Sequence, residues 1–283
     1  MISHLDDFGR GESLWQTTGP GVATMHFLAA NGFPVGAYRH FLGLLAPQHC
    51  IHGLENRGMW PGQPAPDPAF SWDDHVEDLI AFLEYQAARG LMRLPVMGAG
   101  HSIGGALTLL AANRRPELFS RLVLIDPASL PSPTQRQTEP DVSVVMRSVV
   151  EKTLKRRTQW SSREEFVSYL PTREVYSNFR REALDDYALA GLMDDGADGF
   201  RIAYQPAWEA HNFMTTRSIW PSLAEIRVPT LLLYGEGSSL YPAGDIDGLT
   251  AGFSPAVEIV AVRNCGHMIP QEDPEQLARL ILR

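Results

Sequence analysis

The 283-residue chain contains only two cysteines and no apolar run long enough to cross a membrane. Cys50 and Cys265 lie far apart, and two thiols in a chain of this length do not make a disulfide framework. No stretch of about 18 apolar residues exists, which argues against a spanning helix. The first 16 residues include Asp6, Asp7 and Glu12 and lack the apolar segment of a secretory signal. We therefore expect a cytoplasmic protein with free thiols and no membrane partner.

Acidic residues outnumber basic ones, 33 to 24, and the formal net charge is -9. A negative chain repels a phosphate backbone, so a nucleic-acid partner is not expected. The sequence has no phosphate-binding loop and no dinucleotide fingerprint. Four histidines lack an acid or cysteine at metal-ligand spacing, namely His40, His49, His52 and His75. We therefore expect a small-molecule substrate, no cofactor and no metal; the oligomeric state is left open.

Short apolar runs that end at turn residues predict buried strands. They cover residues 22–30, 94–97, 121–125, 229–234 and 258–262. Helical patterns cover residues 72–88, 103–113 and 274–282; Asp73 or Asp74 is the expected cap of the first, and Asp273 of the last. Strand, helix and strand follow one another between residues 94 and 125, which is the order of a βαβ unit. The prediction is an α/β fold with a mostly parallel sheet.

The pattern changes between residues 131 and 221, where strand-like runs give way to amphipathic helices. Val142, Val145, Met146, Val149 and Val150 form one apolar stripe. Further helices are expected from Ser162, which forms a capping box with Glu165, and over residues 182–193, with a loop at 194–199. We therefore expect a core of residues 1–130 and 222–283 and a helical cap of residues 131–221.

The pentapeptide Gly100-His101-Ser102-Ile103-Gly104 follows a predicted strand and opens a predicted helix. This G-x-S-x-G pattern holds a serine on a sharp, strained turn, and small residues two positions away let the chain pack there. The helix N-terminus then favours developing negative charge at the site. We interpret Ser102 as a nucleophile; the competing interpretation is a glycine-rich turn with an incidental serine.

A serine hydroxyl needs a base before it can act as a nucleophile. His267 stands in the loop between the last predicted strand and the last predicted helix. A loop in that position can bring an imidazole over the serine, so His267 is the expected base. The simpler interpretation is a histidine that serves only the loop.

Three further turns carry recognisable residues. They are Asn31-Gly32-Phe33-Pro34, Asn56-Arg57-Gly58, and Gly266-His267 followed by Glu272. Together with the serine pentapeptide they make most of the chain resemble the α/β-hydrolase superfamily. The resemblance implies a mostly parallel sheet flanked by helices, with residues 131–221 as the inserted cap. It also implies an oxyanion hole made by the backbone N–H groups of Phe33 and Ile103. Asn31 replaces the usual histidine of this turn.

The acid departs from the pattern that the resemblance implies. The usual aspartate follows the strand at residues 229–234, where this chain has a serine in Gly235-Glu236-Gly237-Ser238. Asp126 ends the strand after the serine helix, a position that some superfamily members use for the acid. We predict Asp126 as the acid, with Glu236 and a longer-loop Asp245 or Asp247 as alternatives. Asp126 can also be only a turn residue.

The resemblance implies acyl transfer to water by Ser102, His267 and Asp126, with a carboxylic ester as the expected substrate and a thioester or lactone as variants. Haloalkane dehalogenases and epoxide hydrolases are disfavoured because they need an aspartate where Ser102 stands. Two rival classes remain open. One is a lyase or cofactor-free oxygenase on the same scaffold, and the other is a ligand-binding protein that has lost catalysis.

Two cap residues are candidates for substrate contact. Trp208 and His211 follow a proline near the end of the predicted cap and could line a pocket. More often such a cluster is the packed core of a helical lid. His101, beside the serine, is expected to point away from it and to pack.

Overall fold

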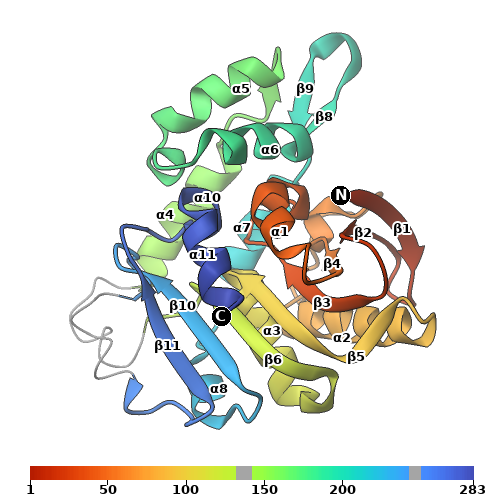
Figure 1. The fold of residues 1–283 in the computed structure, drawn as a ribbon. Coiled ribbons are helices and arrows are strands. Elements are labelled where there is room, and N and C mark those ends of the chain that lie inside the picture. The colour runs from red at the N-terminus through yellow and green to blue at the C-terminus, as the bar shows by residue number, and fades with distance from the viewer. Residues whose placement is uncertain (132–141, 242–249) are drawn as a thin grey trace.

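The computed structural model describes residues 1–131, 142–241 and 250–283 of the chain (Figure 1). Eight strands of the described residues form one sheet. Their order across the sheet is β1 (Ile2–Asp7), β2 (Glu12–Thr18), β4 (Ile51–Leu54), β3 (Ala23–Leu28), β5 (Met92–His101), β6 (Phe119–Ile125), β10 (Thr230–Gly235) and β11 (Val257–Val262). The first three strands pair antiparallel and all later pairs are parallel. This arrangement confirms the predicted α/β fold.

Helices cover both faces of this sheet (Figure 1). One face packs against α1 (Arg39–Leu45) and α11 (Pro274–Ile281). The other packs against α2 (Trp72–Ala88), α3 (Ile103–Arg114) and α8 (Trp220–Glu225). Coverage on both sides buries most positions of the central strands β6 and β10, which explains their continuous apolar runs in the sequence.

The central strands alternate between the two hydrophobic layers. In β6, Val123 and Ile125 belong to the layer with α1 and α11, whereas Leu122 and Leu124 belong to the layer with α2 and α3. This alternation follows from the two-residue period of a strand. The register of each strand therefore fixes which residues reach its carboxyl end.

The structure corrects two local predictions in the core. Helix α2 has the predicted range, but its N-cap is Ser71, whose side chain accepts a hydrogen bond from Asp73 N–H. Asp74 contributes by accepting the Ser71 N–H, which completes a capping box. The strands β1, β2 and β4 were not predicted, since β1 is an edge strand with exposed side chains and β4 has only four residues.

Residues 142–214, which we call the cap segment, rise above the carboxyl ends of the parallel strands (Figure 1). They contain the helices α4 (Val142–Leu154), α5 (Arg163–Tyr169), α6 (Arg181–Gly191) and α7 (Pro206–Met214). They also form a small sheet of β7 (Gln159–Trp160), β9 (Phe200–Ile202) and β8 (Leu192–Asp194). The expectation of helices alone was therefore wrong. Strands this short carry too few residues to show a period.

The predicted boundary at residue 221 falls inside α8, and α8 packs with the core helices. The exact division into core and cap stays a prediction. The Ser162 side chain does cap α5 by accepting Glu165 N–H, but the Glu165 carboxylate bonds Ser161 instead of closing a box on Ser162. Of the predicted stripe on α4, the side chains of Val142 and Val145 lie outside the described part of the structure.

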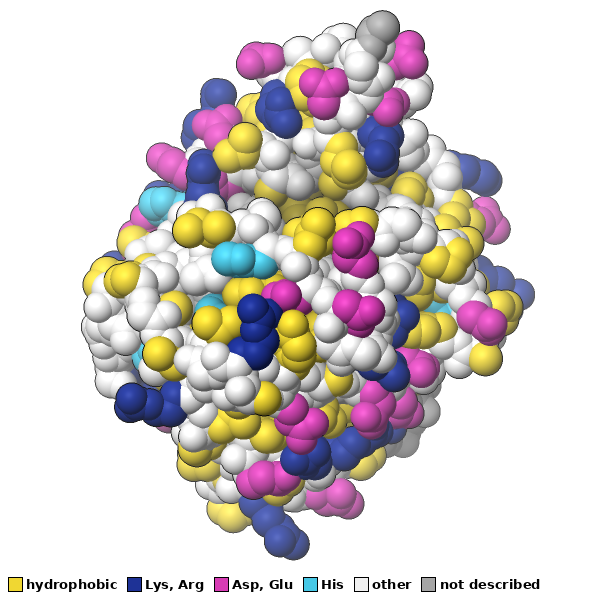
Figure 2. Space-filling view, turned by 90° about the vertical axis from the view of Figure 1, so that its right-hand side faces the viewer, with side chains coloured by type: hydrophobic (Ala, Val, Ile, Leu, Met, Phe, Trp, Pro, Cys, Tyr) yellow, Lys and Arg dark blue, Asp and Glu magenta, His cyan; other side chains and the backbone are white. Residues whose placement is uncertain are grey.

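A hollow separates the cap segment from the core on the side of β1 and β2, and hydrophobic side chains gather in it (Figure 2). The cavity there has a volume of about 660 Å³. Leu14 and Trp60 line it from the core, and Leu189 and Met193 line it from the cap segment. Glu55 also lines this cavity.

Candidate active site

Ser102 lies on a strained turn between β5 and α3. Its φ and ψ are 55° and -121°, a conformation that a non-glycine residue rarely adopts. A Cβ on Gly100 would come within 2.3 Å of the Gly104 backbone, and a Cβ on Gly104 would come equally close to the Leu28 carbonyl. The pentapeptide therefore needs both glycines for steric reasons. Ser102 N–H donates to the Ile125 carbonyl at 2.9 Å, which ties the turn to β6.

The structure brings Ser102, His267 and Asp126 together in one hydrogen-bonded line. The Ser102 Oγ lies 3.0 Å from His267 Nε2. On the other side of the ring, His267 Nδ1 lies 2.7 Å from Asp126 Oδ2. Asp126 is fully buried, whereas the His267 side chain is about one-third exposed (31%). The line thus runs from the protein interior to an imidazole and a hydroxyl that a substrate can approach.

The Asp126 carboxylate is held by both of its oxygens. Gly235 N–H donates to Oδ1 at 2.9 Å, and the Ser238 hydroxyl donates to Oδ2 at 2.7 Å. Ser238 occupies the loop in which the usual aspartate was expected. Asp126, at the end of β6, therefore supplies the carboxylate, and Gly235 and Ser238, at and after the end of β10, supply hydrogen-bond donors to it. Asp126 has a positive φ of 41°, a conformation that a non-glycine residue rarely adopts.

The alternative acids do not meet His267 in the described residues. The Glu236 carboxylate accepts the backbone N–H of Asn264 at 3.2 Å at the protein surface. Asp245 and Asp247 lie outside the described residues. Asp126 is therefore the carboxylate that contacts the histidine ring.

The backbone N–H groups of Ile103 and Phe33, the two expected oxyanion donors, differ in whether they already have a hydrogen-bond acceptor. Ile103 is the first residue of α3 and follows Ser102 directly, so its N–H has no acceptor within the helix. Phe33 N–H instead donates to the Ala30 carbonyl at 3.1 Å within its own turn. The expected role of Phe33 therefore requires that this turn bond be shared or released. Ile103 is the better-placed of the two donors.

Asn31, which stands where the family usually has a histidine, joins this turn to the cap segment. Its Nδ2 donates to the Glu209 carbonyl at 2.9 Å, and its Oδ1 accepts from Asn212 Nδ2 at 3.0 Å. Glu209 in turn forms a partly buried ion pair with Arg156. Burial raises the pKa of the Glu209 carboxyl, and the Arg156 cation counteracts this shift. The turn that carries Phe33 is thus held from the cap side.

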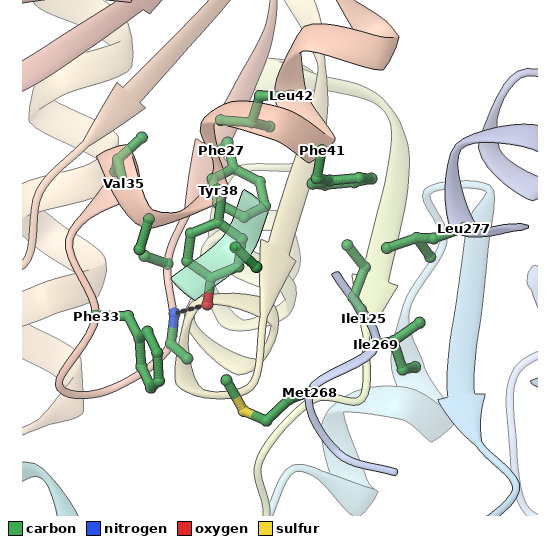
Figure 3. Close-up of a cluster of buried hydrophobic side chains, with 14 of the residues drawn as sticks. Phe27, Phe33, Val35, Tyr38, Phe41, Leu42, Ile125, Met268, Ile269 and Leu277 are labelled. Atoms are coloured by element: carbon green, nitrogen blue, oxygen red, sulfur yellow. Dashed lines mark hydrogen bonds between the residues drawn. The ribbon is translucent and has the colours of Figure 1, made fainter. Parts of the chain in front are cut away.

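His101 does not face the nucleophile but links three parts of the site. Its Nε2 donates to the His267 carbonyl at 2.9 Å, since a carbonyl can only accept, and its Nδ1 therefore accepts from the Tyr38 hydroxyl at 2.7 Å. The Tyr38 oxygen accepts Ala30 N–H at 3.0 Å, the dashed line in Figure 3. Burial, followed by the neighbouring His267, lowers the pKa of His101, so this ring stays neutral.

Tyr38 is a residue of this site that the sequence did not single out. It sits among buried hydrophobic side chains that include Phe27, Phe33 and Met268 (Figure 3). A tyrosine in such a cluster indicates from the sequence only that its hydroxyl needs a partner. The partner, a histidine 63 residues away, depends on the pairing of strands.

Trp208 and His211 lie on α7, away from the cavities found in the described residues. The Trp208 Nε1 donates to the Pro64 carbonyl at 2.8 Å, and His211 Nε2 bonds the Phe70 carbonyl at 2.7 Å. The Phe70 ring packs edge-on against Trp208. Both polar groups are satisfied by the loop of residues 61–70, which fits packing rather than substrate contact.

No metal site is present among residues 1–131, 142–241 and 250–283, where no three His, Cys, Asp or Glu side chains are grouped for one. The same residues contain no helix that is long and apolar enough to span a bilayer. What the site offers chemically is a hydroxyl, a base, a buried carboxylate and one free backbone donor. These are the parts of a nucleophilic mechanism.

Residues 27–280 match the model of the Alpha/beta hydrolase family, and the chain belongs to this family. Among curated relatives, it is 36% identical over 97 residues to the "Type I acyl-CoA thioesterase mpaH" of Penicillium brevicompactum, covering 34% of this chain and 21% of that protein. It is 39% identical over 83 residues to the "Abhydrolase domain-containing protein AKT2" of Alternaria alternata, covering 29% and 28%. These matches therefore span less than a third of either relative.

Solved structures extend the similarity over the whole chain. E-2-(acetamidomethylene)succinate hydrolase superposes with a TM-score of 0.83 at 19% identity, covering 99% of this chain and 97% of that one. A thioesterase domain from the curacin biosynthetic pathway gives a TM-score of 0.75 at 18% identity, covering 100% and 99%. At these identities the likeness shows the fold.

Proposed function

We propose that this protein is a serine hydrolase that cleaves a carboxylic ester or thioester of a small molecule through an acyl-enzyme. The observation that carries the proposal is the hydrogen-bonded line from Ser102 Oγ through His267 to the buried Asp126, with distances of 3.0 and 2.7 Å. A nucleophile, a base and an orienting carboxylate in this order are the parts that acyl transfer requires.

In the first half-reaction, the Ser102 oxygen attacks the substrate carbonyl carbon while its proton passes to His267 Nε2. The carbonyl electron pair moves onto oxygen, which becomes an oxyanion. Asp126 accepts the Nδ1 hydrogen throughout, so it fixes the tautomer and stabilises the imidazolium. When the tetrahedral intermediate collapses, the alcohol or thiol leaves and takes the proton from Nε2.

In the second half-reaction, water replaces the leaving group. His267 removes a proton from the water, whose oxygen attacks the acyl carbon bound to Ser102. Collapse of the second tetrahedral intermediate breaks the bond to Ser102 Oγ, and the proton returns from Nε2 to that oxygen. The products are a carboxylic acid and the regenerated enzyme.

The Ile103 N–H is the principal oxyanion donor in this proposal, helped by the N-terminal end of α3. Phe33 N–H joins it by sharing the bond that it now makes to Ala30. One preorganised donor of this kind contributes roughly 3–4 kcal/mol to the transition state. The Asn31 side chain, bonded to α7, keeps this turn in place.

We propose thioesters and oxygen esters equally as substrates. The curated relatives of the chain include proteins named acyl-CoA thioesterase. The same nucleophile, base and oxyanion donor serve both, because the leaving atom alone differs. A lactone would use the same parts with the leaving alcohol still attached.

The test uses a fluorophosphonate probe together with a panel of esters and thioesters of increasing acyl length. We expect the wild type to be labelled at Ser102 and to hydrolyse members of the panel. Ser102→Ala should lose both properties, whereas Ser120→Ala, which removes an exposed hydroxyl from β6, should keep them. Turnover in an unlabelled Ser102→Ala protein would show that the chemistry is not serine hydrolysis.

A further inference from the structure

A cavity with a volume of about 800 Å³ lies within the cap segment. One wall is a face of α4, where Ser148, Glu151, Lys152 and Lys155 recur at helical spacing. Other lining residues come from α5 and from the 3₁₀ turns Leu170–Thr172 and Glu174–Tyr176. We call it the cap cavity. Its size suits an organic group rather than a single ion.

The cap cavity is positively charged in a protein that is negative overall. Five of its lining residues are basic and two are acidic: Lys152, Lys155, Arg156, Arg157 and Arg173 against Glu151 and Glu174. The whole chain carries a net charge of -9 and has only two lysines, and both of them lie here. Such a local excess of cations attracts an anion.

Two of these cations remain free to bind one. Arg157 pairs with Glu165 at 2.6 Å, and Lys155 lies 3.7 Å from Glu151. Lys152 and Arg173 both line the cavity and form no ion pair with any described residue, although the Arg173 guanidinium lies over the Tyr169 ring at 5.9 Å. An anion between them would gain two charge-assisted hydrogen bonds without breaking an existing pair.

The floor of the cap cavity is aromatic and includes an unpaired donor. Trp160, Tyr176 and Tyr187 line it. Trp160 is 2% exposed, yet its indole N–H has no acceptor among the described residues. A buried donor without a partner is costly, so a ligand with an acceptor on a flat or apolar body would relieve it.

The floor adjoins the turn that flanks the nucleophile. The Tyr187 ring stacks on Phe33 with a centroid distance of 4.7 Å, and the Tyr187 hydroxyl donates to the Gly32 carbonyl at 3.3 Å. Tyr176 also packs against Phe33. A single layer of side chains thus connects the cap cavity to the oxyanion turn.

We propose that the cap cavity binds an anionic, ring-bearing part of the substrate, at a distance from the carbonyl that Ser102 attacks. This inference rests on the proposed hydrolase function and narrows its substrate class. The anion is a phosphate or a carboxylate held between Lys152 and Arg173, and the ring lies on the aromatic floor. Two kinds of substrate could supply such an anion. One is a thioester whose leaving group carries a phosphorylated nucleotide, and the other is a substrate that itself carries a carboxylate.

Binding is tested on the Ser102→Ala protein by titration calorimetry, which does not depend on turnover. The probes are adenosine 3′,5′-bisphosphate, benzylsuccinate and uncharged adenosine. We expect one of the two anions to bind more tightly than adenosine and to weaken as salt rises. The double change Lys152→Gln with Arg173→Gln should weaken it about tenfold to a hundredfold. Arg181→Gln removes a cap cation outside the cavity and should change nothing.

Kinetics then link the cavity to Ser102. An acyl-coenzyme A is compared with the same acyl group on N-acetylcysteamine, and an aryl hemisuccinate with an aryl acetate. A higher kcat/KM for the acyl-coenzyme A than for its N-acetylcysteamine counterpart would identify the anion as phosphate. A higher kcat/KM for the aryl hemisuccinate than for the aryl acetate would identify it as carboxylate. In the double variant, KM for that anionic member should rise about tenfold or more, with kcat and the neutral substrates unchanged.

The outcomes separate this inference from the proposed function. Hydrolysis that shows no preference for either anion, or that responds equally to Arg181→Gln, would overturn the anion site and leave the hydrolase intact. Anion binding that depends on Lys152 and Arg173, in a protein that hydrolyses nothing and resists the fluorophosphonate, would support the anion site and overturn the hydrolase.

Discussion

In the core, Asp126 is fully buried, and its two oxygens together accept hydrogen bonds from Gly235, Ser238 and His267. In the cap cavity, Lys152 and Arg173 are exposed and make no ion pair with a described residue. The first arrangement is complete before any substrate arrives. The second is completed by a ligand, so the two regions are built for different tasks.

Because of this difference, we expect substitutions in the two regions to change different kinetic constants. Groups that are fixed in advance around a reacting atom lower the transition state, so their removal lowers kcat. Free cations that meet a remote part of the substrate contribute equally to ground state and transition state, so their removal raises KM. This division between kcat and KM can be tested by substitution.

Asp126→Asn should have the largest effect. The amide keeps the volume but cannot hold the His267 tautomer or stabilise the imidazolium, so we expect kcat to fall about 10⁴-fold. KM should stay nearly constant, as measured by steady-state hydrolysis of a panel ester. A fall of less than tenfold would mean that another acid, in residues 242–249 or elsewhere, serves His267.

A second test of the acid places a carboxylate at Ser238, in the loop after β10. The Ser238 hydroxyl lies 2.7 Å from the carboxylate oxygen of Asp126 that contacts His267. Ser238→Asp in the Asp126→Asn background should therefore recover part of the lost kcat. Ser238→Ala with the native Asp126 is the control, and it should cost far less than Asp126→Asn because Gly235 still binds the carboxylate. No recovery would show that the loop after β10 cannot deliver an acid.

The sequence predicted the sheet centre well because its strands are covered on both faces. The apolar runs of β5, β6 and β10 were visible without any contact information, and α2 was predicted over its full length. The edge strand β1 was missed because its exposed positions leave no apolar run, and its neighbour β2 was missed because polar residues interrupt its sequence, Glu12–Thr18. The strands of the cap segment were missed because two or three residues carry no period.

In the site, sequence reasoning reached Ser102, His267 and Asp126 but not the groups that hold them. The donor Ser238 was noted only as the residue that replaces an aspartate. Tyr38 and the pair of Arg156 with Glu209 depend on contacts across 63 and 53 residues, which no local pattern records. The cap cavity is lined by residues from 148 to 202, which the fold brings together and no local pattern records.

Glu209→Gln tests how firmly the cap segment is joined to the oxyanion turn. The change leaves the Arg156 cation partly buried without its partner, so we expect the free energy of unfolding to fall by an amount at the lower end of about 3–5 kcal/mol. Arg156→Met in the same protein should return part of this loss. Denaturant titration measures each variant, with Asp185→Asn on the exposed Arg181 pair as the control that changes little. Equal losses in Glu209→Gln and the control would show that the buried pair contributes no more than a surface pair.

Glu55 is another buried carboxyl of the core. Unlike Glu209, it forms no ion pair with a described residue. Burial raises its pKa to about 8, although Val35 N–H and Gln16 donate to it. The folded protein therefore holds a proton that the unfolded chain releases above its ordinary pKa near 4.5. This contribution is fully present below about pH 4.5 and is lost as the pH rises through 8, by up to about 1.4 kcal/mol per pH unit.

Glu55→Gln removes this titration and keeps an acceptor for Val35. The difference in melting temperature between variant and wild type should grow in favour of the variant from pH 5 to pH 8.5. Glu84→Gln, an exposed carboxyl on α2, is the control and should give a constant difference. A constant difference in Glu55→Gln as well would show that Glu55 is already ionised in the folded protein.

Tyr38→Phe should have the smallest effect and the most specific one. It leaves Ala30 N–H and His101 Nδ1 without their shared partner, and His101 holds the carbonyl of His267. We expect kcat to fall about tenfold through a looser histidine loop, because an unsatisfied buried group costs about 1–3 kcal/mol. KM should not change for anionic or neutral substrates. Tyr85→Phe, which removes a hydroxyl at the surface, is the control for loss of an OH. A rise in KM confined to anionic substrates would break the division, because it would show that the network around His101 also shapes the cap cavity.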